Sequence, residues 1–156
     1  MEIKDIMKSP VVIDMDCTLG EVVESMAQKG VNSILVTGEN GELIGIVDVV
    51  TLMNTIVPEY VGNRDKSVAG FIDNNMFKDF IADNRDKKVK YFMHSEPKTI
   101  NVNSSVLSAC IKVTEGRQTR VPVIDDNKKP LWVFTREWVK RYLAETMWFE
   151  CNCTCK

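Results

Sequence analysis

The sequence contains few of the residues on which most enzyme chemistry depends. His94 is the only histidine in 156 residues, and histidine is the most frequent general acid–base and the commonest metal ligand in proteins. We find no Ser/His/Asp or Cys/His constellation and no glycine-rich loop that would hold a phosphate. The sequence therefore favours a binding module and predicts that the chain is not an enzyme.

Long apolar runs and an excess of basic residues are also missing. No run of about 18 apolar residues occurs, so we expect no membrane span. The first residues lack the basic and apolar regions of a signal peptide, so we expect a cytoplasmic protein. The 20 Lys and Arg residues against 22 Asp and Glu residues give a net charge of -2. Without a basic surface, nucleic acid is not an expected partner.

The five cysteines do not form a disulfide framework, because their number is odd and three of them, Cys151, Cys153 and Cys155, lie in the last six residues. Two interpretations of this tail remain open. Its thiols can bind a soft metal ion if a partner subunit supplies further ligands. Alternatively, the tail is an exposed chain end with no metal.

An internal repeat organises the chain. Residues 3–9 recur as residues 89–95, and from Pro10 and Pro97 onward the two copies run in step at an offset of 87 (97 − 10 = 87). Each copy has about 55 residues, near the lower size limit for an independent core. We therefore expect two units that bury their apolar faces against each other. The expected boundaries are a first unit at 1–57, a connector at 58–88, a second unit at 89–146 and a Cys-rich tail at 147–156.

Both copies predict the element order β-α-β-β-α, which makes the chain an α+β protein. Thr18 and Glu21 have the spacing of a capping box, and Gly30 ends the helix that they begin. Asn40 and Gly41 lie between two apolar runs and predict a hairpin. The expected strands are 11–13, 34–36, 43–47, 99–102, 121–124 and 131–134. The expected helices run from Thr18 to Gly30, from Val49 to about Ile56, from Ser104 or Ser105 to Gly116, and from Arg136 to about Trp148.

The connector predicts one further helix. Ser67 is its expected cap, and apolar residues follow at helical spacing. Two interpretations of this helix remain open, an amphipathic helix on the core or a lid or dimer contact. The apolar residues are Val68, Phe71, Ile72, Met76, Phe80 and Ile81.

Four stretches of the chain resemble a tandem CBS-domain pair, or Bateman module. This resemblance implies two β-α-β-β-α units packed around a pseudo-twofold axis, with adenosyl ligands (AMP, ADP, ATP or S-adenosylmethionine) in the clefts between them. It further implies a homodimer that regulates an unidentified protein partner. The stretches are residues 4–10, 18–21, 41–47 and 121–125.

The family's ligand motif is changed in both copies. In the motif Gly-h-h-Thr/Ser-x-x-Asp, where h is apolar, the hydroxyl caps a helix and contacts phosphate or ribose, and the Asp binds the ribose. The first copy has Asp48 and Thr51 at these two positions, and the second has Thr135 and Trp138. The ribose-binding Asp is therefore absent from both copies. Asp48 is expected either to cap its helix or to contact a ligand.

The resemblance nevertheless implies a set of ligand-binding residues, and no catalytic or metal-binding residue. If a nucleotide binds, we expect it at the second copy. Trp138 either stacks on a ligand or fills a ligand-free cleft, and Arg117 and Arg120 are either phosphate contacts or surface residues. If Trp132 and Trp138 fill the clefts, the chain is instead a structural or dimerisation module. The candidate ligand-binding residues are Thr135, Arg136, Trp138, Arg120, Val121, Thr99, Arg117, Asp48, Thr51, Val12 and Ile34.

Overall fold

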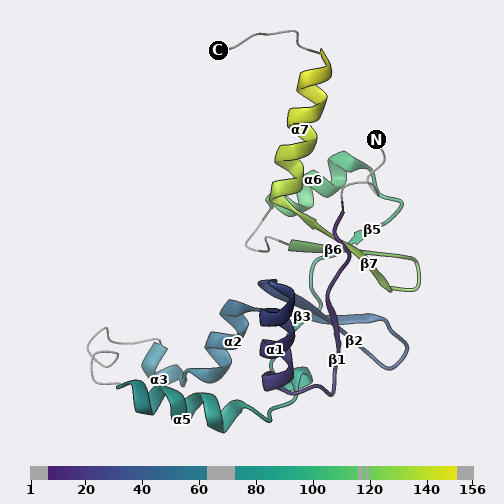
Figure 1. The fold of residues 1–156 in the computed structure, drawn as a ribbon. Coiled ribbons are helices and arrows are strands. Elements are labelled where there is room, and N and C mark those ends of the chain that lie inside the picture. Colours follow the sequence, from purple (N-terminus) through teal and green to yellow (C-terminus); the bar gives the residue numbers. More distant parts are fainter. Residues whose placement is uncertain (1–6, 63–72, 116–117, 119, 151–156) are drawn as a thin grey trace. The chain divides into compact units, whose positions relative to one another are not determined.

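The chain forms two compact units in the computed structural model, which describes residues 7–62, 73–115, 118 and 120–150 (Figure 1). The first unit comprises residues 11–97, and the second comprises residues 7–10 together with 98–150. Within the described residues, no helix is both long enough and apolar enough to span a membrane.

A four-stranded sheet in the order β1-β2-β3-β4 forms the centre of the first unit. Strand β1 runs parallel to β2, whereas β2 and β3, and β3 and β4, are antiparallel pairs. The elements of this unit are β1 (Val12–Asp14), α1 (Leu19–Lys29), β2 (Ser33–Thr37), β3 (Leu43–Asp48), α2 (Val49–Ile56), α3 (Glu59–Gly62), α5 (Asn74–Asn84), a 3-10 turn (Val89–Tyr91) and β4 (His94–Ser95).

Helix α1 has the ends that the sequence predicts. The Thr18 hydroxyl accepts a hydrogen bond from the backbone N–H of Glu21 at 3.3 Å, and the Glu21 carboxylate accepts one from the N–H of Thr18 at 2.7 Å. Gly30 ends the helix in the left-handed region with φ of 62°, where glycine carries no steric cost. The expected capping box and glycine stop are both confirmed.

The first core lies between α1, α2 and the sheet, with Phe77 and Phe80 of α5 packed against it. Helix α5 carries Met76, Phe80 and Ile81, the last three apolar residues of the expected connector helix. Asp73 has extended dihedral angles and its carboxylate accepts from the backbone N–H groups of Asn75 and Met76. An N-cap with these angles begins helix α5 at Asn74, whereas the expected cap, Ser67, lies outside the described residues. The buried residues of this core are Leu19, Val22, Met26, Ile34, Val36, Val47, Leu52, Ile56 and Val89.

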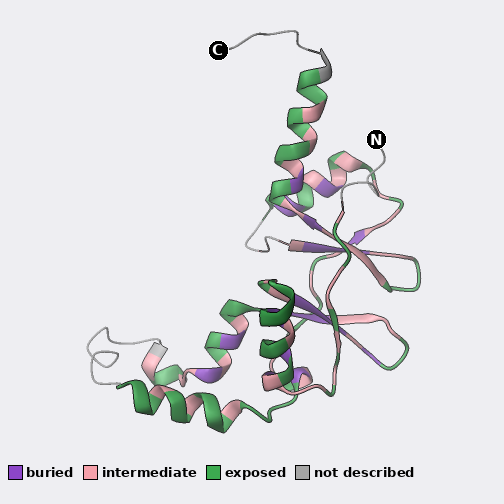
Figure 2. Cartoon of the chain, in the orientation of Figure 1, coloured by how far each residue is buried: buried purple, intermediate pink, exposed green. Residues whose placement is uncertain are grey.

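The second unit repeats the arrangement with a three-stranded sheet in the order β5-β6-β7. Its α6 starts after Ser105, whose hydroxyl accepts from the N–H of Ser108. Figure 2 shows the buried residues of this unit on the sheet, on α6 and on the first turns of α7, with exposed residues farther along α7. The elements are β5 (Ile100–Asn101), α6 (Val106–Thr114), β6 (Arg120–Ile124), β7 (Pro130–Thr135) and α7 (Arg136–Glu150). The expected order β-α-β-β-α is confirmed in both units.

The compact units group the residues differently from the expected boundaries, because each includes the first residues of the other repeat. His94 of β4 pairs with Ile46 in the first unit, and Lys8 forms the equivalent bridge to Val133 in the second. Met7 packs against the second core. The connector residues 73–88 belong to the first unit. The buried residues of the second core are Ile100, Ala109, Val113, Val121, Val123, Phe134 and Trp138.

Candidate functional site

The ligand motif of the first repeat lies where β3 ends and α2 begins. Asp48 is the N-cap of α2, and its Oδ1 accepts from the backbone N–H of Thr51 at 2.7 Å and from the Thr51 hydroxyl at 2.9 Å. In this repeat the acidic residue stands at the hydroxyl position of the family motif and the hydroxyl stands at the Asp position. The two side chains, Asp48 and Thr51, therefore contact each other directly. We call this helix start, together with Ser33, which lies opposite Asp48 on strand β2, the α2 end. Its residues are Ser33, Asp48, Val49 and Thr51.

The ligand motif of the second repeat lies where β7 ends and α7 begins. Thr135 is the last residue of β7, and its hydroxyl accepts from the backbone N–H of Trp138 at 3.4 Å. The neighbouring Arg136 is exposed, and its Nε donates to the carbonyl oxygen of Val113 in the last turn of α6 at 3.3 Å. We call residues Arg120, Thr135 and Arg136 the α7 end.

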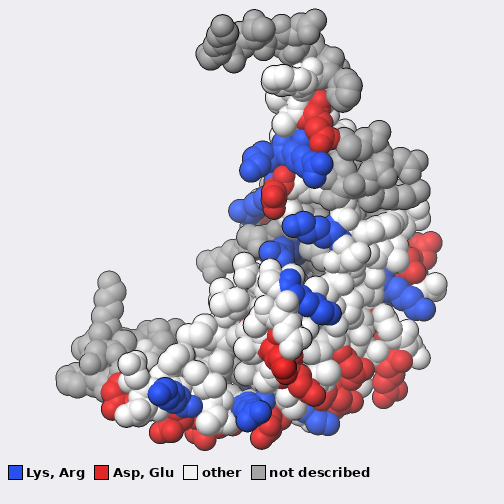
Figure 3. Space-filling view, in the orientation of Figure 1, with Lys and Arg blue, Asp and Glu red and all other residues white. Residues whose placement is uncertain are grey.

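Strand register places one further residue beside each helix start. In the second unit Arg120 lies directly opposite Thr135, and in the first unit Ser33 lies directly opposite Asp48. Sequence reasoning included Arg120 but missed Ser33, although the repeat offset identifies it (120 − 87 = 33). The α7 end therefore combines a hydroxyl with two basic residues, with the acidic Glu137 next in the first turn of α7, whereas the α2 end carries one carboxylate. Figure 3 shows basic side chains along α7, interrupted by acidic ones.

Trp138 lies in the core of the second unit. Its side chain is 5% exposed, and its ring centroid is 4.6 Å from that of Phe134 and 5.5 Å from that of Tyr142, on which it stacks. Its Nε1 is buried and has no hydrogen-bond partner among the described residues. Of the two interpretations of Trp138, these contacts match the one in which the indole fills space, because stacking on a ligand requires a free ring face.

Two further candidates contribute no exposed side chain. Ile34 and Val121, which are equivalent in the two repeats, are both fully buried in their cores. Only their backbone groups could contact a ligand.

Val12, on edge strand β1, is 38% exposed. The carbonyl oxygen of Thr99, its equivalent in the second repeat, accepts from Lys112 Nζ at 2.9 Å.

Gln118 supports the α7 end and was missed in the sequence. Its Nε2 donates to the carbonyl oxygens of Arg120 at 2.9 Å and Lys98 at 3.0 Å, and its Oε1 accepts from the N–H of Lys98. It thus joins the strand that carries Arg120 to the segment before β5. No sequence motif identifies a glutamine with this structural role, so the role of Gln118 could not be predicted from the sequence.

Arg117 and the tail cysteines Cys151, Cys153 and Cys155 lie outside the described residues. Within the part of the chain that the structure describes, no group of three or more His, Cys, Asp or Glu side chains has the geometry of a metal site. The two interpretations of the tail, with and without a metal ion, therefore both stay open.

Comparison with known proteins gives one family and several similar folds. The model of the CBS domain family matches residues 3–58 and 89–137. The structure of the CBS-pair protein CBSX2 from Arabidopsis thaliana is 20% identical with a TM-score of 0.73, over 93% of this chain and 95% of that one. Staphylococcus aureus OpuCA is 22% identical with a TM-score of 0.65, over 92% of this chain and 99% of that one. No curated protein sequence matches the chain.

Two further similar structures contain adenosyl ligands. CBSX2 in complex with AMP is 20% identical to this chain with a TM-score of 0.68, over 93% of this chain and 97% of that one. The CBS-domain pair of protein MJ0100, in complex with 5′-methylthioadenosine and S-adenosyl-L-methionine, is 20% identical with a TM-score of 0.64, over 92% of this chain and 96% of that one. The expected tandem CBS fold is thus confirmed.

Proposed function

The chain belongs to the CBS domain family, and from that premise we propose that it is a regulatory, non-catalytic CBS pair that senses an adenosyl ligand. Occupancy of the site would shift the population of conformers that a partner protein recognises. The expected homodimer, the cytoplasmic location and regulation of an unidentified protein partner stay predictions.

The α7 end is the observation that carries this proposal. A helix N-terminus directs unpaired backbone N–H groups and the positive end of the helix dipole toward a bound anion. The Thr135 hydroxyl lies at this N-terminus, Arg120 lies across from it, and Arg136 follows it. Arginines add charge-assisted hydrogen bonds to phosphate. The α7 end therefore suits the phosphate of an adenosine nucleotide.

The ligands of similar structures support the adenosyl class. One CBS-pair structure contains AMP, and another contains 5′-methylthioadenosine and S-adenosyl-L-methionine. These two sets share an adenosine group and differ in what is attached at its 5′ carbon. Because sequence identity to both is 20%, the ligand of this chain has to be established by measurement.

A structural CBS pair that binds no ligand is the second candidate function. The burial of Trp138 favours it, because the second repeat has this large ring where the family places the ribose-binding Asp. Trp132, at the position of the motif glycine, also packs against the second core. Both substitutions replace groups that contact or accommodate ligands with apolar bulk.

Thermal unfolding with AMP, ADP, ATP and S-adenosylmethionine separates the two candidates. A ligand at 100 times its dissociation constant stabilises the folded state by about 2.7 kcal/mol, which raises the melting temperature by several degrees. If no compound shifts the melting temperature, the sensor function is excluded and the structural function remains.

Thr135→Asp then tests the place of binding. Aspartate also caps helices well, so α7 should persist, but its charge should weaken AMP binding at least tenfold. Thr18→Asp is the matched control, because it adds the same charge at the N-cap of α1. Equal AMP affinity in wild type and Thr135→Asp would exclude the α7 end as the phosphate site.

A further inference from the structure

We propose that the last turns of α7 pair in parallel with the same turns of a second copy of this chain, and that the two adjoining tails bind Zn²⁺ through thiolates of Cys151, Cys153 and Cys155. The proposal uses residues outside both ligand motifs, so it does not depend on the proposed function. We call residues 143–148 the distal turns of α7.

The distal turns extend beyond the core of the second unit. Tyr142 is the last partly buried apolar residue of α7 that packs against this core. After it, Leu143, Met147 and Trp148 are 46%, 63% and 81% exposed, and Figure 2 shows this part of the helix as exposed. At 3.6 residues per turn, these three residues lie within about 140° of the helix circumference. The distal turns therefore present one apolar face that is open to solvent in the single chain.

A second copy of the chain is the occupant that fits this face. Contiguous exposed apolar surface marks interaction sites, and a two-fold axis brings such a surface against its own copy. The flanking charges permit this arrangement, because Arg141 Nε donates to Glu145 Oε1 at 3.1 Å within one chain and the pair carries no net charge toward its copy. Lys140, three residues before Leu143, is exposed, which confines the pairing to the distal turns.

Three thiols follow the distal turns. Cys151, Cys153 and Cys155 lie outside the described residues, and the sequence alone places them after Glu150. Thiolates are common ligands of Zn²⁺, and structural zinc sites are almost always closed by four protein ligands. One tail supplies three thiolates, which is one too few, whereas two tails supply six (2 × 3 = 6).

The other two cysteines of the chain are poorly suited to supply the fourth thiolate. Cys17 belongs to the first unit, and Cys110 lies on α6 and packs against the second core. Burial raises the pKa of both thiols, which keeps them protonated, whereas the metal ligand is the thiolate. The fourth thiolate therefore comes from the tail of a second copy.

Parallel pairing places the two tails at the same end of the helix pair. In an antiparallel pair the tails would leave from opposite ends, and each would again have three thiols. Pairing of the distal turns raises the effective concentration of the second tail, and the free energy of metal binding adds to that of association. The apolar face and the thiols thus support the same assembly.

Native mass spectrometry of the full chain under reducing conditions tests the proposal, with Zn²⁺ as the probe. The expected zinc-loaded species contains one Zn²⁺ per two chains, and a chelator should remove the zinc. Replacing the three tail cysteines together, as Cys151→Ser/Cys153→Ser/Cys155→Ser, should abolish zinc binding. Cys17→Ser/Cys110→Ser is the matched control and should bind zinc as the wild type does.

Met147→Ala/Trp148→Ala tests the pairing surface. Both residues are exposed and alanine favours a helix, so α7 should persist, while the zinc dissociation constant, measured by competition with a chelator, should rise at least tenfold. Leu107→Ala is the matched control, because Leu107 is 70% exposed on α6 of the same unit, and it should leave the constant unchanged.

Four outcomes would overturn the inference, and the proposed function stands in each of them. The wild-type chain binds no Zn²⁺, or a single chain holds the ion without a second copy. Alternatively, the chain without tail cysteines binds zinc as the wild type does, or Met147→Ala/Trp148→Ala leaves zinc binding unchanged.

Discussion

Trp138 and Asp48 show how one substitution changes the role of a motif position. At the position where the family motif has its Asp, the Trp138 ring packs against Phe134 and Tyr142. At the hydroxyl position of the first repeat, Asp48 keeps the N-cap role of a hydroxyl and adds a negative charge. Both residues satisfy the local structure, so their effect on ligand binding follows from bulk and charge.

Replacing Trp138 separates the packing of the ring from its polar group. Trp138→Ala should destabilise the chain by about 3–5 kcal/mol, because it removes a buried ring. Trp138→Phe should cost far less, because it keeps an aromatic ring and removes an N–H that has no partner among the described residues. Urea unfolding of both variants measures the difference. Equal losses would show that the indole N–H has a partner that matters.

The start of α1 shows how elements distant in sequence complete one another. The N–H groups of Leu19 and Gly20 donate to the carbonyl oxygens of Lys87 at 2.8 Å and Arg85 at 3.0 Å, and the capping box pairs Thr18 with Glu21. The first N–H groups of a helix have no partner inside it. The end of the connector supplies these partners and thereby fixes its own path along the first unit.

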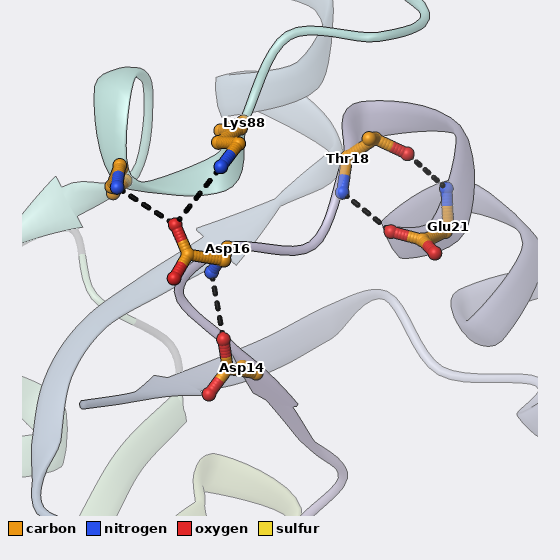
Figure 4. A network of polar contacts seen from close by, with 6 residues as sticks. Asp14, Asp16, Thr18, Glu21 and Lys88 are labelled. Carbon is orange, nitrogen blue, oxygen red and sulfur yellow. Dashed lines mark hydrogen bonds and ion pairs between the residues drawn. The ribbon is translucent and has the colours of Figure 1, made fainter. Parts of the chain in front are cut away.

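An ion-pair network reinforces this junction (Figure 4). Asp16 accepts from Lys90 Nζ at 2.7 Å and Lys88 Nζ at 3.3 Å. The hydrogen bond from Lys90, followed by that from Lys88, lowers the pKa of Asp16 below its ordinary 3.8. Because Asp16 is half exposed, the pairs are open to screening by salt.

Asp16→Asn should therefore destabilise the chain in a way that depends on pH and salt. A carboxyl whose pKa is lowered by folding contributes stability above its ordinary pKa, and that contribution is lost as the pH falls through the folded-state pKa. The difference in unfolding free energy between wild type and variant should be constant above about pH 5, shrink as the pH falls below 3.8, and decrease in about 1 M salt. Urea titrations across pH and salt measure it. A difference that stays constant would contradict the ion-pair origin.

At the scale of the whole molecule, the two compact units each have their own core, and each includes the first residues of the other repeat. Met93 contacts the first core and Met7 the second. A Cβ at Gly45 would overlap the Met93 side chain, and the matching position in the second repeat is Trp132, which shares its core with Met7. At this matched position the first unit thus has a glycine that leaves room for Met93, whereas the second unit has Trp132 in the core that Met7 contacts.

Met7→Ala and Met93→Ala should loosen different units. Met7→Ala should speed amide exchange roughly tenfold in β7, a loss of about 1.4 kcal/mol, and leave β3 unchanged. Met93→Ala should do the reverse. Each variant is the control for the other in a hydrogen–deuterium exchange experiment. Faster exchange in both units from either variant would show that the assignment of residues 7–10 to the second unit is wrong.

Much of the fold follows from the sequence alone. The repeat offset is visible in the sequence itself, the capping box at Thr18 and the stop at Gly30 are local signals, and the structure confirms each of them. Asp48 as the N-cap of α2 is confirmed for the same reason, because capping involves residues within one turn. Asp73 as the N-cap of α5 was missed, and the cap that the sequence predicted, Ser67, lies outside the described residues.

What only the tertiary structure decided depends on contacts between residues distant in the sequence. The sequence by itself determined the class, the repeat and the composition of both helix starts. Strand register then placed Arg120 opposite Thr135 and Ser33 opposite Asp48, and core packing placed the Trp138 ring inside its unit. The spacing of apolar residues predicts which face of a helix is buried, but it does not specify which side chains pack against each other. The charge contrast between the α2 end and the α7 end therefore became visible only when the strands were paired.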